Sequence, residues 1–234
     1  MTRSLIFFAV AGLLGIFVVP ALSVAPPIPD WARPGTLWRV SQSPCGATTS
    51  NRAQVTLPFN PGDSLAIALP GSVRYEPADK AEAIVSGDPA LVEHVRIEND
   101  TLRLDCEPDG LSNLEINLTG PAITDWRLLG SAKLALTDIA QRQLRLTISG
   151  SGNVTAAGAV ETIGLKISGS GNAELKGLVA KSAEIEISGS GHAQSTVEKD
   201  AEVSISGSGA VKLFGHPNMS RSNVTGSGRI VQEP

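Results

Sequence analysis

The chain has few aromatic residues and no excess of positive charge. Only 4% of its 234 residues are aromatic, 18% are charged, and the formal net charge is −4. Without a basic excess, a function driven by binding to nucleic-acid phosphates is excluded. The hydrophobic share of 41% is nevertheless too high, and the net charge too small, for an intrinsically disordered chain. We therefore expect a folded protein whose core is mostly aliphatic.

Side chains that usually carry catalysis or bind metals are also scarce. The three histidines, His94, His192 and His216, belong to no motif that would place them beside a cysteine. The chain lacks the Gly-x-Ser-x-Gly motif of a nucleophilic serine, and its acidic residues are scattered. We therefore predict no catalytic residues, no cofactor and no metal ligands, and we expect that the protein is not an enzyme.

The first residues are typical of an export signal. Arg3 precedes an apolar run over 5–19, and Ala21 and Ser23 are small residues of the kind that signal peptidase accepts. We predict a signal peptide over 1–23; the alternative is an uncleaved anchor, which would be the protein's one contact with a membrane.

A proline-rich segment and two cysteines follow. Residues 24–44 are predicted to form a stiff spacer, because their prolines are incompatible with a helix or a central strand.

Cys45 and Cys106 are the only cysteines, and two cysteines in an exported protein most often pair. We expect a structural disulfide between them.

Glycine, in contrast, is abundant, and its positions reveal a repeat. The tripeptide Gly-Ser-Gly occurs five times, with steps of 19, 20, 18 and 19 residues between the first glycines. Repetition at such a period indicates a solenoid, in which each repeat forms one coil stacked on the last. Glycine suits a sharp corner because it adopts positive φ angles without steric penalty. We assign a structural role to the ten corner glycines: Gly150, Gly152, Gly169, Gly171, Gly189, Gly191, Gly207, Gly209, Gly226 and Gly228.

The residues around each corner predict β-strands. Apolar residues stand two and four positions before the first glycine, with a polar residue between them, and a second alternating segment follows the corner. Such alternation is typical of strands with one face in a core. We expect an all-β fold, a parallel β-helix of about 18–20 residues per coil, with a looser bend and a third short face. The column two positions before the corner consists of Ile148, Ile167, Ile187, Ile205 and Val224.

The polar residues of the repeat leave two interpretations open. The middle serine of each corner can hydrogen-bond along the stack, so that corner geometry alone explains the motif. A ladder of hydroxyls could instead form a ligand surface, at Ser149, Ser168, Ser188, Ser206 and Thr225. On an outer face, Glu184, Glu186 and Glu202 form either a solvated acidic surface or a weak cation site, and Lys166 can pair with Glu186 one coil away.

The segment 45–126 also reads as β-structure but is less regular. We predict short strands, a β-hairpin around Asn99-Asp100, and one helical turn over 89–94. These residues would form the first coils and the N-terminal cap, because a solenoid otherwise exposes an unpaired strand edge. Residues 127–234 would form the regular β-helix of the same domain.

The recurring Ile-Ser-Gly-Ser-Gly-Asn, at 148–153 and 167–172, resembles the putative auto-transporter adhesin head GIN domain family of bacterial exported proteins. The segment 87–104 is similar to the less repetitive first half of that family. The resemblance implies a right-handed parallel β-helix at the envelope, in the bacterial periplasm or on the cell surface. It supplies no catalytic residues.

These features favour a non-catalytic envelope or surface module that presents a rigid β-helix for adhesion or polymer binding. Its partner would be a surface polysaccharide or an envelope protein. Phe214 is the only aromatic residue after position 126, so contacts to sugars would run through hydroxyls and amides. The alternative is a self-associating scaffold, a homo-oligomer joined through its coils. A polysaccharide-active enzyme is the least favoured reading, because the chain lacks paired carboxylates in a loop-walled cleft.

Overall fold

The computed structural model describes residues 44–46, 51–108 and 114–234, which belong to one compact unit, Gln42–Pro234. The predicted signal peptide over 1–23 and all of the spacer except Pro44 lie outside the described residues. Within the described residues, no helix is long and apolar enough to cross a membrane.

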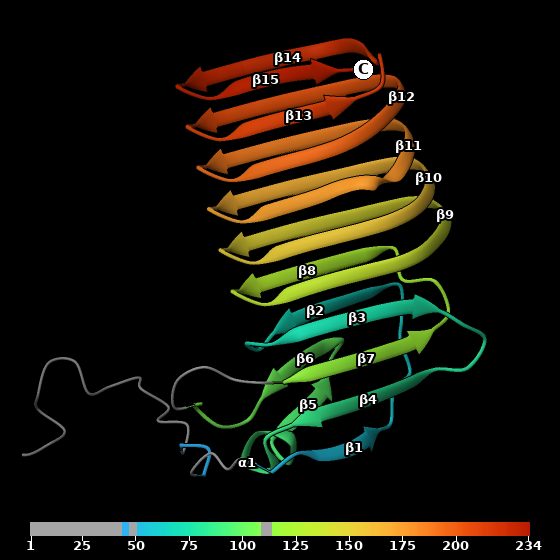
Figure 1. Cartoon of the computed structure of the whole chain (residues 1–234), viewed down its shortest axis with the longest axis vertical. Coiled ribbons are helices and arrows are strands. Elements are labelled where there is room, and N and C mark those ends of the chain that lie inside the picture. The colour runs from blue at the N-terminus through green and yellow to red at the C-terminus, as the bar shows by residue number, and fades with distance from the viewer. Residues whose placement is uncertain (1–43, 47–50, 109–113) are drawn as a thin grey trace, which may run out of the picture. The chain divides into compact units, whose positions relative to one another are not determined.

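The described residues form a single sheet of 15 strands and one short helix, α1 (Pro89–Val92) (Figure 1). Most strands pair in parallel, and successive coils stack on one another, which confirms the predicted parallel β-helix. The strands are β1 (Ala53–Leu57), β2 (Ser64–Ala68), β3 (Ser72–Pro77), β4 (Glu82–Gly87), β5 (Val95–Glu98), β6 (Thr101–Leu104), β7 (Glu115–Gly120), β8 (Asp125–Gly130), β9 (Lys133–Gly150), β10 (Asn153–Gly169), β11 (Asn172–Gly189), β12 (His192–Gly207), β13 (Ala210–Phe214), β14 (Asn218–Gly226) and β15 (Arg229–Glu233).

Each long strand from β9 to β12 follows one complete coil. It begins after one corner, turns back at a wider bend, and ends at the first glycine of the next corner (Figure 1). In β10, every second residue is buried up to Ala156. The next buried residues are Val160 and Ile163, so that a short third segment forms the bend. The predicted inward column is confirmed, because Ile148, Ile167, Ile187, Ile205 and Val224 pair in register from coil to coil.

The first coils are built from shorter strands. β2 and β3 pair in parallel with β8 and β9, so the stacked part of the fold begins at Ser64. Beyond them, β7, β4 and β1 continue one face of the sheet, and β1 and β4 are antiparallel to their neighbours. The predicted hairpin joins β5 to β6 through Asn99 and Asp100, whose positive φ angles of 50° and 55° are those of a type I′ turn. The predicted helical turn is α1, which Asp88 caps by accepting a hydrogen bond from the Ala90 N–H.

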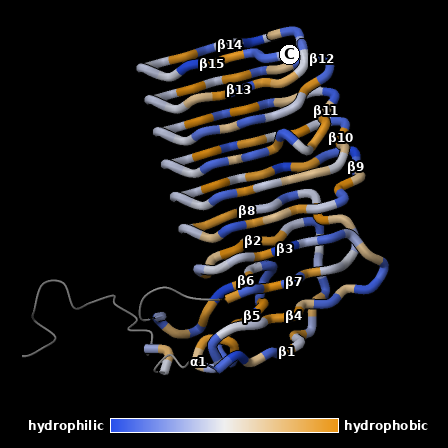
Figure 2. Tube along the Cα trace, viewed as in Figure 1, coloured by the Kyte–Doolittle hydropathy of each residue, from blue (hydrophilic) through white to orange (hydrophobic). Residues whose placement is uncertain are grey.

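One continuous hydrophobic core lies inside these coils. Figure 2 shows hydrophobic and hydrophilic residues interspersed along the stacked strands. The large rings of the core lie in the N-terminal coils, where the centroids of Tyr75 and Trp126 are 4.9 Å apart. The Tyr75 hydroxyl lies 2.7 Å from the carbonyl oxygen of Pro121, to which it donates, and burial raises the pKa of this phenol. Further along the solenoid the core narrows to aliphatic side chains, which explains the low aromatic content of the repeats.

The two glycines of a corner serve different purposes. Gly169 has a φ of +122°, and a Cβ at this position would lie 2.6 Å from the carbonyl oxygen of Gly150 in the preceding coil. Gly171 faces inward, and its Cβ would lie 2.6 Å from Cγ2 of Ile148. Ser170 between them is exposed, and its backbone N–H donates to the Gly150 carbonyl at 2.9 Å. Each corner is therefore held by backbone hydrogen bonds and leaves no space for a side chain at either glycine.

We expect Gly169→Ala and Gly171→Ala each to lower the free energy of unfolding by about 1–3 kcal/mol, because the new methyl group meets backbone or core atoms. Ser170→Ala should change it by less than about 0.5 kcal/mol, since this side chain points to solvent. Urea unfolding of the three variants measures the difference. Glycine variants as stable as Ser170→Ala would contradict the assigned role of the corner glycines.

Candidate binding surface

A groove crosses the outer face of the solenoid close to the bends of the coils. Its volume is about 420 Å³, and its lining residues come from β9, β10, β11, β12 and β14. Adjacent strands of a sheet are about 4.8 Å apart, so a groove across five strands is about 19 Å long. It runs along the stacking axis, perpendicular to the strands. We call it the axial groove.

Small side chains open the middle of the axial groove, and charged side chains lie along its length. Gly164, Ser182 and Ala183 provide the space in the middle. Arg145 lies toward one end, 3.8 Å from Asp125, and Glu202 toward the other, 3.9 Å from Arg221. At these distances the ion pairs are weak, so the charged groups remain available for other partners. The described lining contains no aromatic residue.

The acidic residues that the sequence assigned to one outer face divide between two places. Glu184 and Glu202 are paired in register and both line the axial groove. Glu186, two residues from Glu184, instead forms the predicted ion pair with Lys166, at 3.0 Å. A second pair of this kind joins Lys181 to Glu161 at 3.0 Å, and the ammonium of Lys181 lowers the pKa of the Glu161 carboxyl. Such exposed pairs add little stability, but they link neighbouring coils.

The hydroxyl groups at the corners form two columns along the stack. In the described residues, none of these side chains hydrogen-bonds to another group of the protein. The expected bonding of the corner serines along the stack runs through the backbone instead, as from the Ser170 N–H to the Gly150 carbonyl. Other hydroxyls do bond to the neighbouring coil, as Thr196 does by donating to the Lys176 carbonyl at 2.9 Å. The columns are Ser149, Ser168, Ser188, Ser206 and Thr225 before the corner, and Ser151, Ser170, Ser190, Ser208 and Ser227 within it.

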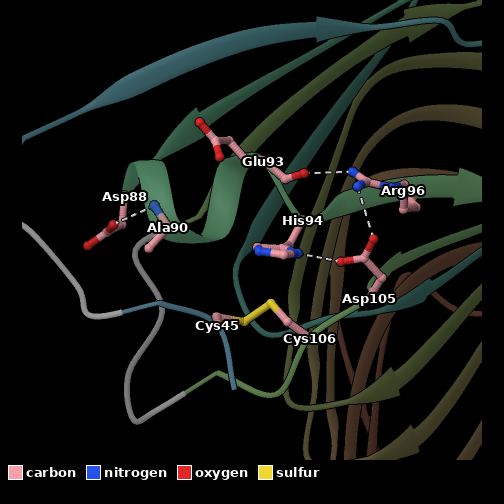
Figure 3. Close-up of a disulfide and its surroundings, with 8 residues drawn as sticks. All are labelled: Cys45, Asp88, Ala90, Glu93, His94, Arg96, Asp105 and Cys106. Carbon is pink, nitrogen blue, oxygen red and sulfur yellow. Dashed lines mark hydrogen bonds and ion pairs between the residues drawn. A yellow bond between two sulfur atoms is a disulfide. The ribbon is translucent and has the colours of Figure 1, made fainter. Parts of the chain in front are cut away.

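A third polar cluster lies in the N-terminal cap, next to the disulfide (Figure 3). The Asp105 carboxylate contacts Nδ1 of His94 at 2.6 Å and the Arg96 guanidinium at 3.0 Å. The Cys106 sulfur lies within 4.8 Å of the His94 and Asp105 ligand atoms. Because this sulfur is bonded to Cys45, it is not a thiolate and cannot serve as a metal ligand. The cluster therefore orders the cap around the disulfide.

Sequence reasoning missed the contact between His94 and Asp105, although one signal for it was present. The hairpin around Asn99-Asp100 pairs Val95 with Leu104. Continued by one residue, the same register places His94 opposite Asp105. The axial groove left no such signal in the sequence, because its residues are spread over five coils.

The predicted disulfide between Cys45 and Cys106 is formed and spans 61 residues. We expect the double variant Cys45→Ala/Cys106→Ala to lose about 2–4 kcal/mol of unfolding free energy, because the unfolded chain is no longer restricted by the closed loop. Urea unfolding of the oxidised protein and the variant measures this loss. Added dithiothreitol should shift the midpoint of the oxidised protein and leave the variant unchanged. Equal midpoints for all samples would contradict a stabilising disulfide.

The stacked parallel coils and the aliphatic core define this chain as a parallel β-solenoid. A comparison with family models adds the particular family: the model described as "Putative auto-transporter adhesin, head GIN domain" matches residues 63–217. The chain therefore belongs to this family, as the repeats indicated. No curated protein matches the sequence.

Solved structures share the fold at low sequence identity. A putative adhesin from Bacteroides fragilis is 18% identical, with a TM-score of 0.62, and the match covers 80% of this chain and 99% of that one. A structure described as a putative lipid binding protein from Parabacteroides distasonis is 17% identical, with a TM-score of 0.52, and covers 80% and 98%. At these identities the likeness shows a common fold and no common ligand.

Proposed function

We propose that this protein is a non-catalytic module of the bacterial envelope that binds an extended, hydroxyl-rich polymer along its axial groove. The groove itself carries this proposal. It follows the stacking axis for about 19 Å and is open to solvent, so that it fits a segment of a linear chain better than a small compact molecule. The proposed partner is a surface polysaccharide, and the alternative is an extended segment of an envelope protein.

The chemistry of the lining supports a polar ligand. Ser182, Thr162 and Gln143 offer hydroxyl and amide groups, and Arg145 and Glu184 add a charged donor and acceptor. These groups can exchange hydrogen bonds with sugar hydroxyls directly or through water. Because the described lining has no ring to stack on a sugar, we expect modest affinity at one groove and stronger attachment when many copies bind one polymer.

The groove is a better candidate than the corner hydroxyls. The corner columns stand on a convex edge, where a ligand would keep most of its surface in water, whereas a concave site covers more of it. Regular spacing of the serines follows from the coil spacing alone and does not require a ligand.

The chemistry of the described residues supports a role without catalysis. The histidine–carboxylate contact, His94 with Asp105, shares its carboxylate with Arg96 and lies beside a disulfide rather than a free nucleophile. The carboxylates of the groove, Glu184, Asp200 and Glu202, lie on strands of a rigid sheet without long loops to enclose a substrate.

The disulfide and the family indicate an exported protein. We propose that the signal segment over 1–23 directs export and is cleaved, and that the module acts in the periplasm or on the cell surface. In either place a rigid solenoid can hold the axial groove away from the start of the folded unit.

Filling the axial groove should abolish polymer binding without unfolding the protein. Gly164 suits this test, because a Cβ there would approach nothing closer than Cγ of Arg145, at 3.9 Å. We expect Gly164→Gln/Ser182→Gln to weaken retention on purified envelope polysaccharide by at least about tenfold, which corresponds to about 1.4 kcal/mol. The variant adds no charge and no aromatic ring that could bind sugar by itself.

The matched control is Ser170→Gln, which adds the same side chain at the convex corner and should bind like the original protein. A broad glycan array then identifies the polymer class. Equal retention of the groove-filled variant would exclude the groove as the site. If the original protein is retained neither by envelope polysaccharides nor on the array, the proposed polysaccharide binding is wrong.

A further inference from the structure

The C-terminal end of the solenoid has an unpaired edge on both of its faces. Among the described residues, β14 pairs only with β12, and β15 pairs only with β13 (Figure 1). Each strand therefore presents a row of backbone N–H and C=O groups without a neighbouring strand. The inward column is uncovered there as well: Val224 is 39% exposed, whereas Ile205, one coil earlier, is 1% exposed.

The other end of the fold is closed differently. There, β1 and β4 add antiparallel strands to the sheet, and α1 contacts both of them. The inward residues Val85 and Leu91 are at most 2% exposed in this region. The uncovered apolar column is thus a feature of the C-terminal end.

The sequence of β15 is self-complementary in an antiparallel arrangement. It reads Arg-Ile-Val-Gln-Glu, and Arg229, Val231 and Glu233 occupy its outward positions. If the same strand of a second copy pairs with it around Val231, each Arg229 stands opposite a Glu233 and the two Val231 side chains meet. Opposite charges on directly paired positions stabilise antiparallel strands. Glu233 also contacts the ammonium of Lys212 in its own copy at 2.7 Å, so in this arrangement its carboxylate lies between two cations. The charge pattern favours this partner and this register.

We propose that two copies of this chain join end to end at this edge, with a two-fold axis passing beside Val231. A two-fold axis perpendicular to the sheet faces reverses every strand, so β15 pairs with β15 and β14 with β14, both antiparallel. The sheets then continue from one copy into the other, and each Val224 is covered by the coil of its partner. The strand β14 carries one charged residue, Arg221, which lies 3.9 Å from Glu202 of its own copy.

A second copy added head to tail fits less well. In that arrangement β15 would meet β1 of the next molecule, whose sequence Ala-Gln-Val-Thr-Leu carries no charge. Arg229 and Glu233 would then find no partners across the joint. The charges therefore favour a closed dimer over an open filament, and this inference is independent of what the axial groove binds.

Charge reversal at β15 tests the proposed register. We expect the purified chain to form a dimer in sedimentation velocity, and Arg229→Glu or Glu233→Arg to raise the dissociation constant at least about tenfold, because each variant opposes two pairs of like charges. Mixing the two single variants should restore dimerisation, since opposite charges then meet at every position. The double variant Arg229→Glu/Glu233→Arg should dimerise better than either single variant, although it loses the contact of Glu233 with Lys212.

Lys166→Glu is the matched control for Arg229→Glu, because it makes the same change of net charge in the middle of the stack and should leave the dimer intact. Urea unfolding of every variant verifies that these exposed substitutions preserve the fold. A monomer at every concentration, or a filament that grows with concentration, would overturn the proposal. A mixture of the single variants that dimerises no better than either alone would also overturn it.

Discussion

In-register pairing of each coil with the next is the interaction on which the rest of this structure depends. Parallel ladders join β9 to β10, β10 to β11 and β11 to β12 over nearly their whole length. Variation in repeat length is absorbed where the register shifts, as between Thr155 and Ala157 and between Leu175 and Val179, on the way to the bend. The corners stay aligned, and this alignment is why both glycines recur in every Gly-Ser-Gly.

The same pairing places different constraints on the inward and the outward side chains of the sheet. Inward positions must pack against the equivalent positions of the neighbouring coils, so in the repeats they are mostly aliphatic, with Ser195 as a buried polar exception. Outward positions have no such constraint and vary among Lys166, Glu186 and Ser204 in one column. The chemistry specific to this protein therefore lies on the outside, where small residues such as Gly164 and Ser182 open the axial groove.

The two ends of the stack of coils differ in how their strand edges and inward residues are covered. Antiparallel strands, α1 and the disulfide close the N-terminal end, and the contacts of Asp105 with His94 and Arg96 order the residues around it. At the other end Val224 is exposed, and no further strand of the described residues pairs with the outer edges of β14 and β15. An open edge is a cost for a soluble solenoid unless another strand covers it.

The sequence by itself determined the coil, its inward columns, the glycine corners, the hairpin at Asn99-Asp100 and the pairing of Lys166 with Glu186. These features depend on alternation and on a fixed repeat, which are local patterns. Only the tertiary structure decided the axial groove, the unbonded serine hydroxyls and the surroundings of the disulfide. The groove depends on which small residues of separate repeats lie side by side. Whether a hydroxyl reaches the next coil depends on the direction of its side chain, because Thr196 bonds to the Lys176 carbonyl at 2.9 Å while the corner serines do not bond. No pattern of residue types encodes that direction.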